Sequence, residues 1–498
     1  MIHQYVNNGY HIVLDVNSGS VHVVDETAYR VIPIVEEALK QNIEAAEEIV
    51  TYVSEKMLRI KTTTDQPALE FSGENKGVSD TLSGSSSIGE DTAFDELQET
   101  IEEILALKDA GMLYTEDIYE KYIDGFKDRQ TVVKALCLHI AHDCNLACKY
   151  CFAGEGEYHG RRVLMSYEVG KKALDFLVSN SGSRVNLEVD FFGGEPLMNW
   201  DVVKKLVAYG RSLEKPHNKK FRFTLTTNGV LLNDDVLAFV NKEMANIVLS
   251  VDGRKEIHDL MRPRRGGQGS YDEVVPKYKK VAESRNQMNY YVRGTFTRNN
   301  LDFTEDVRHL ADEGFEQISM EPVVAPDTED YALRDEDVPA LLAEYDKLAL
   351  EYIRRKKEGK GFNFFHFMID LDGGPCVAKR LSGCGSGTEY LAVTPWGDLY
   401  PCHQFVGQEE FLMGNVDEGI IRTDISDTFK ICNVYAKEKC RDCFAKYYCS
   451  GGCAANAYNF SGSIEGSYDL GCELQKKRVE CAIMIKAALA DEEKEKIL

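Results

Sequence analysis

The sequence predicts an α/β protein built around a partial (β/α)6 barrel. Three observations predict this fold class. The 498 residues exceed the length of one ordinary domain. Apolar strand candidates alternate with helical candidates over residues 130–360, which is typical of parallel strands joined by crossover helices. The fourteen cysteines fall in two groups, 137–151 and 376–481, separated by a long cysteine-free stretch. We therefore expect three domains, 1–125, 130–360 and 370–485.

The first predicted domain combines a hairpin with helices. Two apolar runs flank residues 17–20, a turn sequence, and predict a β-hairpin. Helical periodicity then predicts helices over 26–40, 43–59 and 92–110. Ser and Gly dominate residues 72–90, which favours a flexible loop before the last helix.

The central domain contains six predicted strand–helix units. The strands are expected over 133–140, 185–192, 221–227, 246–251, 289–297 and 317–324. The helices are expected over 166–180, 200–214, 233–243, 271–285, 303–313 and 336–357. Ser166 and Asn233 are suitable N-caps for two of them. Functional side chains in such folds lie at the carboxyl ends of the strands. The segment after about residue 375 is short of long periodic elements, so it would depend on metal or cluster cross-links.

Charge and cysteine content limit the partners and the compartment. The chain has 58 Lys and Arg against 82 Asp and Glu, a formal charge of −24. This balance argues against nucleic acid or an anionic membrane as the main partner. No apolar run of about 18 residues predicts a membrane span, and residues 1–10 show no signal-peptide pattern. We therefore expect a cytoplasmic protein, where reducing conditions favour metal or cluster ligation over disulfides.

The first cysteine motif directly follows the first strand of the predicted barrel. Cys144, Cys148 and Cys151 form a C-x3-C-x2-C triplet with an aromatic residue before the third cysteine. Three thiolates this close in sequence can hold one corner of a compact metal centre and leave a position open to another ligand. A structural zinc site completed by His139 or His142 is the alternative.

The triplet resembles the signature of the radical S-adenosylmethionine enzymes. This resemblance implies that the triplet holds a [4Fe–4S] cluster whose fourth iron chelates S-adenosylmethionine. It also implies a cofactor pocket along the strand ends, formed by Gly193, Gly194, Glu195, Asn228, Ser250 and Arg293. In that pocket the Gly-Gly-Glu-Pro sequence would bind the methionine amino group, and Arg293 would pair with the carboxylate. Ordinary turns and a barrel-edge salt bridge are the alternatives.

The C-terminal cysteines resemble those of the SPASM domain, which holds two auxiliary iron–sulfur clusters in related enzymes. The resemblance implies one cluster on Cys440, Cys443, Cys449 and Cys472, and another on Cys384, Cys402 and Cys453, with Cys376 as the candidate fourth ligand. Without Cys376, an iron of the second cluster would be open to a substrate thiolate. A zinc knuckle is the alternative for the four-cysteine set. Cys137, Cys432 and Cys481 fit no motif and are expected to be buried packing residues.

The N-terminal domain resembles a winged-helix-like module that recognises leader peptides. An exposed strand edge in such a module could bind an extended leader by β-addition. A plain domain that caps the barrel is the alternative.

The whole pattern is similar to the maturases of six-cysteine (SCIFF) peptides. The resemblance rests on the sequences around Cys376, Cys384 and Cys402, the last within Pro-Cys-His-Gln. It implies thioether formation between a cysteine sulfur and a carbon of a Cys-rich precursor peptide. The implied cofactors are S-adenosylmethionine and three [4Fe–4S] clusters, and the implied electron donor is a flavodoxin- or ferredoxin-like protein. Carbon–carbon cross-linking, formylglycine formation in a sulfatase, and a non-catalytic iron–sulfur redox or sensor protein are the alternatives.

Overall fold

The computed structural model describes residues 1–64, 90–158, 160–371 and 377–495. The chain divides into two compact units, Met1–Ile118 and Tyr119–Leu498, and each is described by itself. The predicted loop over residues 72–90 lies outside the described residues except for its last position, Glu90, at which a helix begins. The predicted ligand Cys376 also lies outside them.

The first unit contains the predicted hairpin and three helices. Its strands are β1 (Ile2–Asn7), β2 (Tyr10–Asp15) and β3 (Val21–Val24), which pair antiparallel in that order. Its helices are α1 (Glu26–Lys40), α2 (Ala46–Thr64) and α3 (Glu90–Asp109). A common core of aliphatic side chains, among them Val13, Val35 and Ile101, joins the sheet to the helices. The hairpin and helices are confirmed and β1 was not predicted, while the winged-helix character of the unit stays a prediction.

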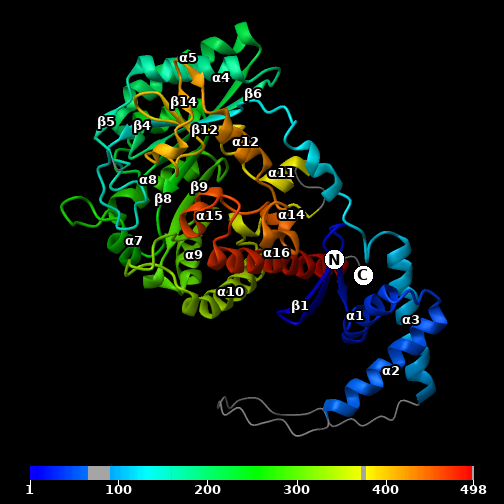
Figure 1. The fold of residues 1–498 in the computed structure, drawn as a ribbon. Coiled ribbons are helices and arrows are strands. Elements are labelled where there is room, and N and C mark those ends of the chain that lie inside the picture. The colour runs from blue at the N-terminus through cyan, green and yellow to red at the C-terminus, as the bar shows by residue number, and fades with distance from the viewer. Residues whose placement is uncertain (65–89, 159, 372–376, 496–498) are drawn as a thin grey trace. The chain divides into compact units, whose positions relative to one another are not determined.

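The second unit is built on the predicted parallel sheet (Figure 1). Its six parallel strands are β4 (Ala135–His142), β6 (Asn186–Gly193), β7 (Lys220–Thr227), β8 (Met244–Ser250), β9 (Tyr290–Phe296) and β10 (Gln317–Pro322). Its crossover helices include α4 (Tyr167–Asn180), α5 (Trp200–His217), α6 (Asp234–Glu243), α8 (Tyr271–Ser284), α9 (Phe303–Asp312) and α10 (Val338–Lys357). Short α7 (Lys255–Met261), β5 (Val163–Leu164) and β11 (Asn363–Phe364) complete this part. All six predicted strand–helix pairs are present, consistent with a partial barrel.

The predicted N-caps and the burial pattern explain why these elements form where they do. Ser166 and Asn233 each accept a hydrogen bond from the backbone N–H three residues later, at the starts of α4 and α6. In β6 and β7, fully buried apolar residues such as Phe191 and Phe223 alternate with half-buried or exposed residues. One face of the sheet therefore packs as a core, and the other face is left partly open.

The C-terminal segment extends the same sheet. Strand β12 (Tyr390–Val393) pairs parallel with β4, and β13 (Asp398–Tyr400), β14 (Gly414–Asn415) and β15 (Gly419–Ile420) follow antiparallel. Its helices are α11 (Val377–Ser382), α12 (Thr423–Ile431), α13 (Glu438–Arg441), α14 (Lys446–Cys449), α15 (Ala454–Ser461) and α16 (Asp469–Glu495). Helix α16 packs along α10 (Figure 1).

The sequence predicted that the segment after about residue 375 is short of long periodic elements. This prediction is wrong for α16, which has 27 residues. Gly471 near its start, together with charged and apolar residues mixed along its length, weakens the helical pattern in the sequence. Within the described part of the chain, no helix combines the length and apolar character needed to cross a membrane.

Candidate active site

The cysteine triplet lies in the loop that follows β4, at the carboxyl edge of the sheet. Cys144, Cys148 and Cys151 are all partly buried and line one cavity. Burial raises the pKa of Cys144 and of Cys148 to about 12. Two N–H groups also point at the Cys144 sulfur: the backbone N–H of Leu146 and Nδ2 of Asn228, each 3.5 Å from Sγ. The loop thus presents three thiols to the cavity, and the ionised forms of Cys144 and Cys148 require a positive partner.

These features fit an iron–sulfur cluster. A metal-bound cysteine is a thiolate, which burial disfavours unless a positive charge compensates it. Hydrogen bonds to the sulfur ligands are among the features that tune such clusters. Among the residues that the structure describes, no group of three His, Cys, Asp or Glu side chains is arranged to hold a single metal ion. In a [4Fe–4S] cluster each cysteine binds a different iron atom. The three sulfur atoms therefore need not converge on one point, as the ligands of a single metal ion must.

The two glycines of the Gly-Gly-Glu-Pro sequence let the end of β6 pack against the cysteine loop. A Cβ atom on Gly193 would lie 2.3 Å from the carbonyl oxygen of Ala141. One on Gly194 would lie 2.0 Å from the carbonyl oxygen of Asp143, directly before Cys144. Any larger residue would therefore displace the backbone that carries the first cysteine.

Glu195 lies behind the glycines and is completely buried. Its carboxylate accepts hydrogen bonds from the N–H of Leu197, the hydroxyl of Thr227 and the N–H of Asn228, at 2.8–3.0 Å. Burial raises the pKa of Glu195 to about 7, although these three donors oppose the shift. The side chain of Glu195 thus links the end of β6 to the end of β7 through hydrogen bonds. That Glu195 contacts a cofactor stays a prediction.

Asp252 is fully buried and accepts hydrogen bonds from several parts of the chain. The sequence analysis did not assign this residue to the site. The hydroxyl of Tyr150, between the second and third cysteines, lies 2.8 and 2.6 Å from its two oxygens. Arg262 Nε and the N–H of Thr295 each donate to Asp252 at 3.0 Å. The Arg262 guanidinium also lies 5.3 Å from the centre of the Tyr150 ring. Asp252 therefore connects the cysteine loop to the ends of β8 and β9 through hydrogen bonds. The signal in the sequence for this contact was the aromatic residue inside the triplet, Tyr150.

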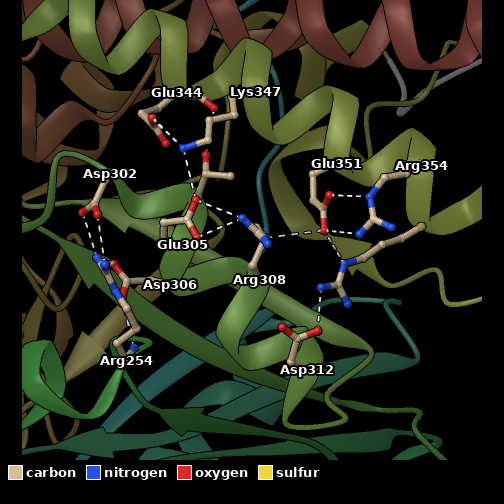
Figure 2. A network of polar contacts seen from close by, with 12 residues as sticks. Arg254, Asp302, Glu305, Asp306, Arg308, Asp312, Glu344, Lys347, Glu351 and Arg354 are labelled. Carbon is tan, nitrogen blue, oxygen red and sulfur yellow. Dashed lines mark hydrogen bonds and ion pairs between the residues drawn. The ribbon is translucent and has the colours of Figure 1, made fainter.

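The loop that follows Ser250 is fixed by polar contacts with α9 (Figure 2). The backbone N–H and Nε of Arg254 both donate to Asp306 at 2.9 Å, and its outer nitrogens donate to Asp302 at 2.9 and 2.7 Å. Gly253 has a φ of +104°, and a Cβ there would lie 2.2 Å from Asp306. These contacts hold the end of β8, where Ser250 faces the cavity.

A cavity of about 1110 Å³ brings the predicted groups together. Besides the triplet, it is lined by the predicted cofactor residues Gly193, Gly194, Asn228, Ser250 and Arg293, but not by Glu195. It is also lined by Cys440, Cys443, Cys449, Cys453 and Cys472. Single-ligand pockets are usually about 300–1,000 Å³, so this cavity has room for a cofactor and part of a larger substrate.

The C-terminal cysteines fall into two neighbourhoods. The first contains Cys440, Cys443, Cys449 and Cys472, and the second contains Cys384, Cys402 and Cys453. Burial, with a smaller contribution from the thiols around each, raises the pKa of Cys449 and of Cys402 to about 12. These two neighbourhoods contain the same cysteines as the two sets that the resemblance to the SPASM domain implies. Cluster binding by them stays a prediction. Cys137, Cys432 and Cys481 are buried, as expected.

The two histidines considered as zinc ligands pair with each other. Nδ1 of His139 lies 3.0 Å from Nε2 of His142, and both rings pack against Tyr158. Burial lowers the pKa of both histidines, to about 4 for His142, so both are neutral near pH 7.

The sequence of this chain is similar to those of several known proteins. The Radical SAM superfamily model matches residues 138–327. An uncharacterised protein of Methanocaldococcus jannaschii is 28% identical, over 38% of this chain and 62% of that protein. The cysteine-type anaerobic sulfatase-maturating enzyme of Clostridium novyi is 22% identical, over 63% of this chain and 86% of its own length. The subtilosin biosynthesis protein AlbA of Bacillus subtilis is 25% identical, over 56% of each chain.

A solved structure extends the likeness to the fold. The structure of anSMEcpe with bound AdoMet matches with a TM-score of 0.62 at 20% identity, covering 72% of this chain and 96% of that one. At this identity the match shows a shared fold.

Proposed function

Residues 138–327 form a radical S-adenosylmethionine domain, and from this premise we propose that the protein is an enzyme that forms thioether bonds in a Cys-rich peptide. The observation that carries the proposal is the cavity that the Cys144 triplet shares with five cysteines of the C-terminal segment. Relatives named for maturing a sulfatase and for making the bacteriocin subtilosin support a peptide or protein substrate.

The residues around the strand ends supply the cofactor site. Cys144, Cys148 and Cys151 would hold a [4Fe–4S] cluster, and S-adenosylmethionine would bind beside it along Gly193, Gly194, Asn228, Ser250 and Arg293. When bound, this pair supplies a 5′-deoxyadenosyl radical, which takes a hydrogen atom from the substrate. Gly194 keeps the end of β6 close to the cysteine loop, and Asn228 donates toward the Cys144 sulfur.

The cavity walls would orient the substrate and protect the reacting atoms. Apolar side chains that line the cavity include Phe152, Phe192 and Val323. Beside a reactive carbon, side chains of this kind would exclude water and would favour reaction with the bound substrate.

Joining sulfur to carbon removes two hydrogens from the peptide. One leaves as a hydrogen atom to the adenosyl group, and the other leaves as a proton and an electron, which need an acceptor. The C-terminal cysteine neighbourhoods would hold two further [4Fe–4S] clusters in that role, with Cys376 deciding whether one iron is open to sulfur. A flavodoxin- or ferredoxin-like protein in the cytoplasm would supply the first electron.

The first unit would bind the leader of the precursor peptide. Strands β1 and β3 are the two edges of its sheet, and an extended peptide can add to such an edge through main-chain hydrogen bonds. This role belongs to the proposal together with the winged-helix character of the unit.

Mass spectrometry of a co-expressed peptide tests the proposal. The probe is a Cys-rich precursor peptide that carries its own leader and is expressed together with this chain. We expect a loss of two hydrogens and one free thiol for each bond formed, and no change with a variant in which the three triplet cysteines are alanine. A loss of two hydrogens with every thiol retained would contradict thioether formation and favour a carbon–carbon bond.

Formylglycine formation in a sulfatase is the second candidate. Matches to sulfatase-maturating enzymes that cover 85–86% of those relatives favour it. In the same assay with a sulfatase peptide, this activity would remove the cysteine sulfur from the product, which distinguishes it from a thioether.

A further inference from the structure

A buried lysine lies close to both C-terminal cysteine neighbourhoods, and the proposed function leaves it without a role. Lys437 directly precedes α13, and only 4% of the residue is exposed. Burial raises the pKa of Cys440 in the first neighbourhood and of Cys453 in the second, and the positive charge of Lys437 opposes the shift at both. One lysine therefore acts electrostatically on both sets of cysteines.

The side chain of Lys437 packs against the turn that joins the two neighbourhoods. A Cβ atom on Gly451 would lie 3.6 Å from Cδ and from Cε of Lys437. Gly451 stands between Cys449 and Cys453 in the chain and lines the cavity. The ammonium group donates to the carbonyl oxygen of Gly466 at 3.2 Å, and Gly466 also lines the cavity. The charge thus lies behind the wall in which these cysteines are set.

The ammonium group of Lys437 lacks a carboxylate partner. In the part of the chain that the structure describes, no Asp or Glu oxygen lies within 4.0 Å of its Nζ. Lys439 and Lys476, which line the cavity, instead pair with Asp469 and Glu473, and 64% and 36% of their side chains are exposed. A buried charge without a counter-ion is costly, so Lys437 requires a negative group nearby.

Iron–sulfur clusters on the two cysteine sets fit this requirement. A [4Fe–4S] cluster held by cysteine thiolates carries a net negative charge, and its net charge is one of the features that set its reduction potential. The buried thiols need a positive partner to ionise, and the buried ammonium needs a negative one. Clusters at both sets would satisfy the cysteines and Lys437 together.

We propose that Lys437 is the counter-charge shared by the two auxiliary clusters, and that it raises their reduction potentials. In the step concerned, the sulfur of the peptide thiol bonds to the substrate carbon radical, the thiol proton goes to water, and one electron passes to a cluster. A positive charge nearby favours this transfer, because reduction makes the cluster more negative. Lys437 acts through the clusters and does not contact the substrate. This inference rests on the proposed function, since it requires both auxiliary clusters.

Redox titration of Lys437→Met and Lys437→Arg, followed by electron paramagnetic resonance, tests the inference. Both substitutions are made in the iron-loaded full chain whose three triplet cysteines are alanine, so that only the auxiliary clusters contribute. Methionine keeps much of the length but loses the charge. We expect the equilibrium constant for reduction of each cluster to fall about tenfold, which is about 59 mV for one electron. Arginine keeps the charge and should leave both potentials close to those of the parent chain.

Lys439→Met is the matched control for loss of a lysine in the same segment. The charge of Lys439 interacts with Cys472 of the first neighbourhood, but its side chain is exposed and pairs with Asp469 at 2.6 Å. Water and dissolved ions screen an exposed charge. We therefore expect a much smaller shift of either potential than with Lys437→Met.

Iron analysis of the same samples separates this inference from the function on which it rests. About eight iron atoms per chain are expected in the parent chain if both auxiliary clusters form. A parent chain without this iron contradicts the proposed role of the clusters, and the inference with it. If the clusters form, the inference alone is overturned by unchanged potentials in Lys437→Met, by a shift at only one cluster, or by an equal shift in Lys437→Arg or Lys439→Met.

Loss of iron in Lys437→Met would move the test to cluster assembly. Full iron content in Lys437→Arg would then support the counter-charge, because this variant differs from Lys437→Met in keeping the positive charge. Loss of iron in both variants would overturn the inference, since the fit of the lysine side chain and not its charge would then be what the segment requires.

Discussion

Asn228 is the side chain that connects the end of β7 most directly to the cysteine loop. Its Nδ2 lies 2.7 Å from Asn145 Oδ1 and 3.5 Å from the Cys144 sulfur. Its own Oδ1 accepts from the N–H of Val230 at 3.1 Å, which fixes the orientation of the amide. The group that points at sulfur is therefore the NH2.

Asn228→Ala should lower the reduction potential of the cluster on the triplet. A hydrogen bond to sulfur favours the reduced, more negative cluster, so its loss should lower the potential by about 20–60 mV. A redox titration followed by electron paramagnetic resonance measures this shift. Asn233→Ala, which removes only the N-cap of α6, should leave the potential unchanged. An unaltered potential in the Asn228 variant would show that the amide does not act on the cluster.

Gly194→Ala should prevent cluster assembly at the triplet. The added methyl would meet the Asp143 carbonyl oxygen at 2.0 Å, and a backbone atom cannot yield as a flexible side chain can. We expect about four fewer iron atoms per chain by iron analysis of the purified protein. Gly125→Ala is the matched control, because no atom lies within 4 Å of its Cβ position. Full iron content in the Gly194 variant would contradict the tight packing described here.

Helices α9 and α10 are linked by a network of ion pairs that continues from the loop behind Ser250 (Figure 2). Arg308 on α9 pairs with Glu305 at 3.0 Å and lies 3.7 Å from Glu351 on α10. Lys347 of α10 reaches back to Glu305 at 3.1 Å. These contacts stabilise the outer layer that supports the ends of β8 and β9, away from the cavity.

Glu351→Gln should make the stability of this layer less dependent on pH. Hydrogen bonds from Arg354 and then Arg355 outweigh burial and hold the pKa of Glu351 at about 2, below its ordinary 4.5. The stabilisation is therefore present above pH 4.5 and lost as the pH falls toward 2. We expect the variant to be less stable by ~1–2 kcal/mol at pH 7, with a smaller difference at pH 3.5. Denaturant unfolding at both pH values measures this, and a constant difference would refute it.

Across the whole molecule, the sequence predicts repeated local patterns well. The six strand–helix units were found because apolar runs and helical periods alternate, and N-caps such as Ser166 mark helix starts. The triplet was found because its spacing is local, and the C-terminal cysteines were assigned through their resemblance to the SPASM domain. Strand β1 and helix α16 were missed, since β1 depends on its pairing with β2 and α16 on its packing against α10.

The buried charge beside the C-terminal cysteines could not be read from sequence for the same reason. Lys437 belongs to no motif, and it looks like an ordinary surface charge in its own segment. Its burial depends on how the turn at Gly451 packs against it. The sequence likewise gives Glu195 a place in a motif but not its burial behind the glycines, which follows from the joining of β6 to β7.

Release of 5′-deoxyadenosine tests the central claim most directly. The purified, iron-loaded chain is reduced without oxygen in the presence of S-adenosylmethionine, and the product is measured by liquid chromatography. We expect release by the wild-type chain and by Cys481→Ala, which alters a buried cysteine outside every motif, and none by Cys144→Ala. No release from the fully loaded wild-type chain, or equal release from Cys144→Ala, would contradict the account.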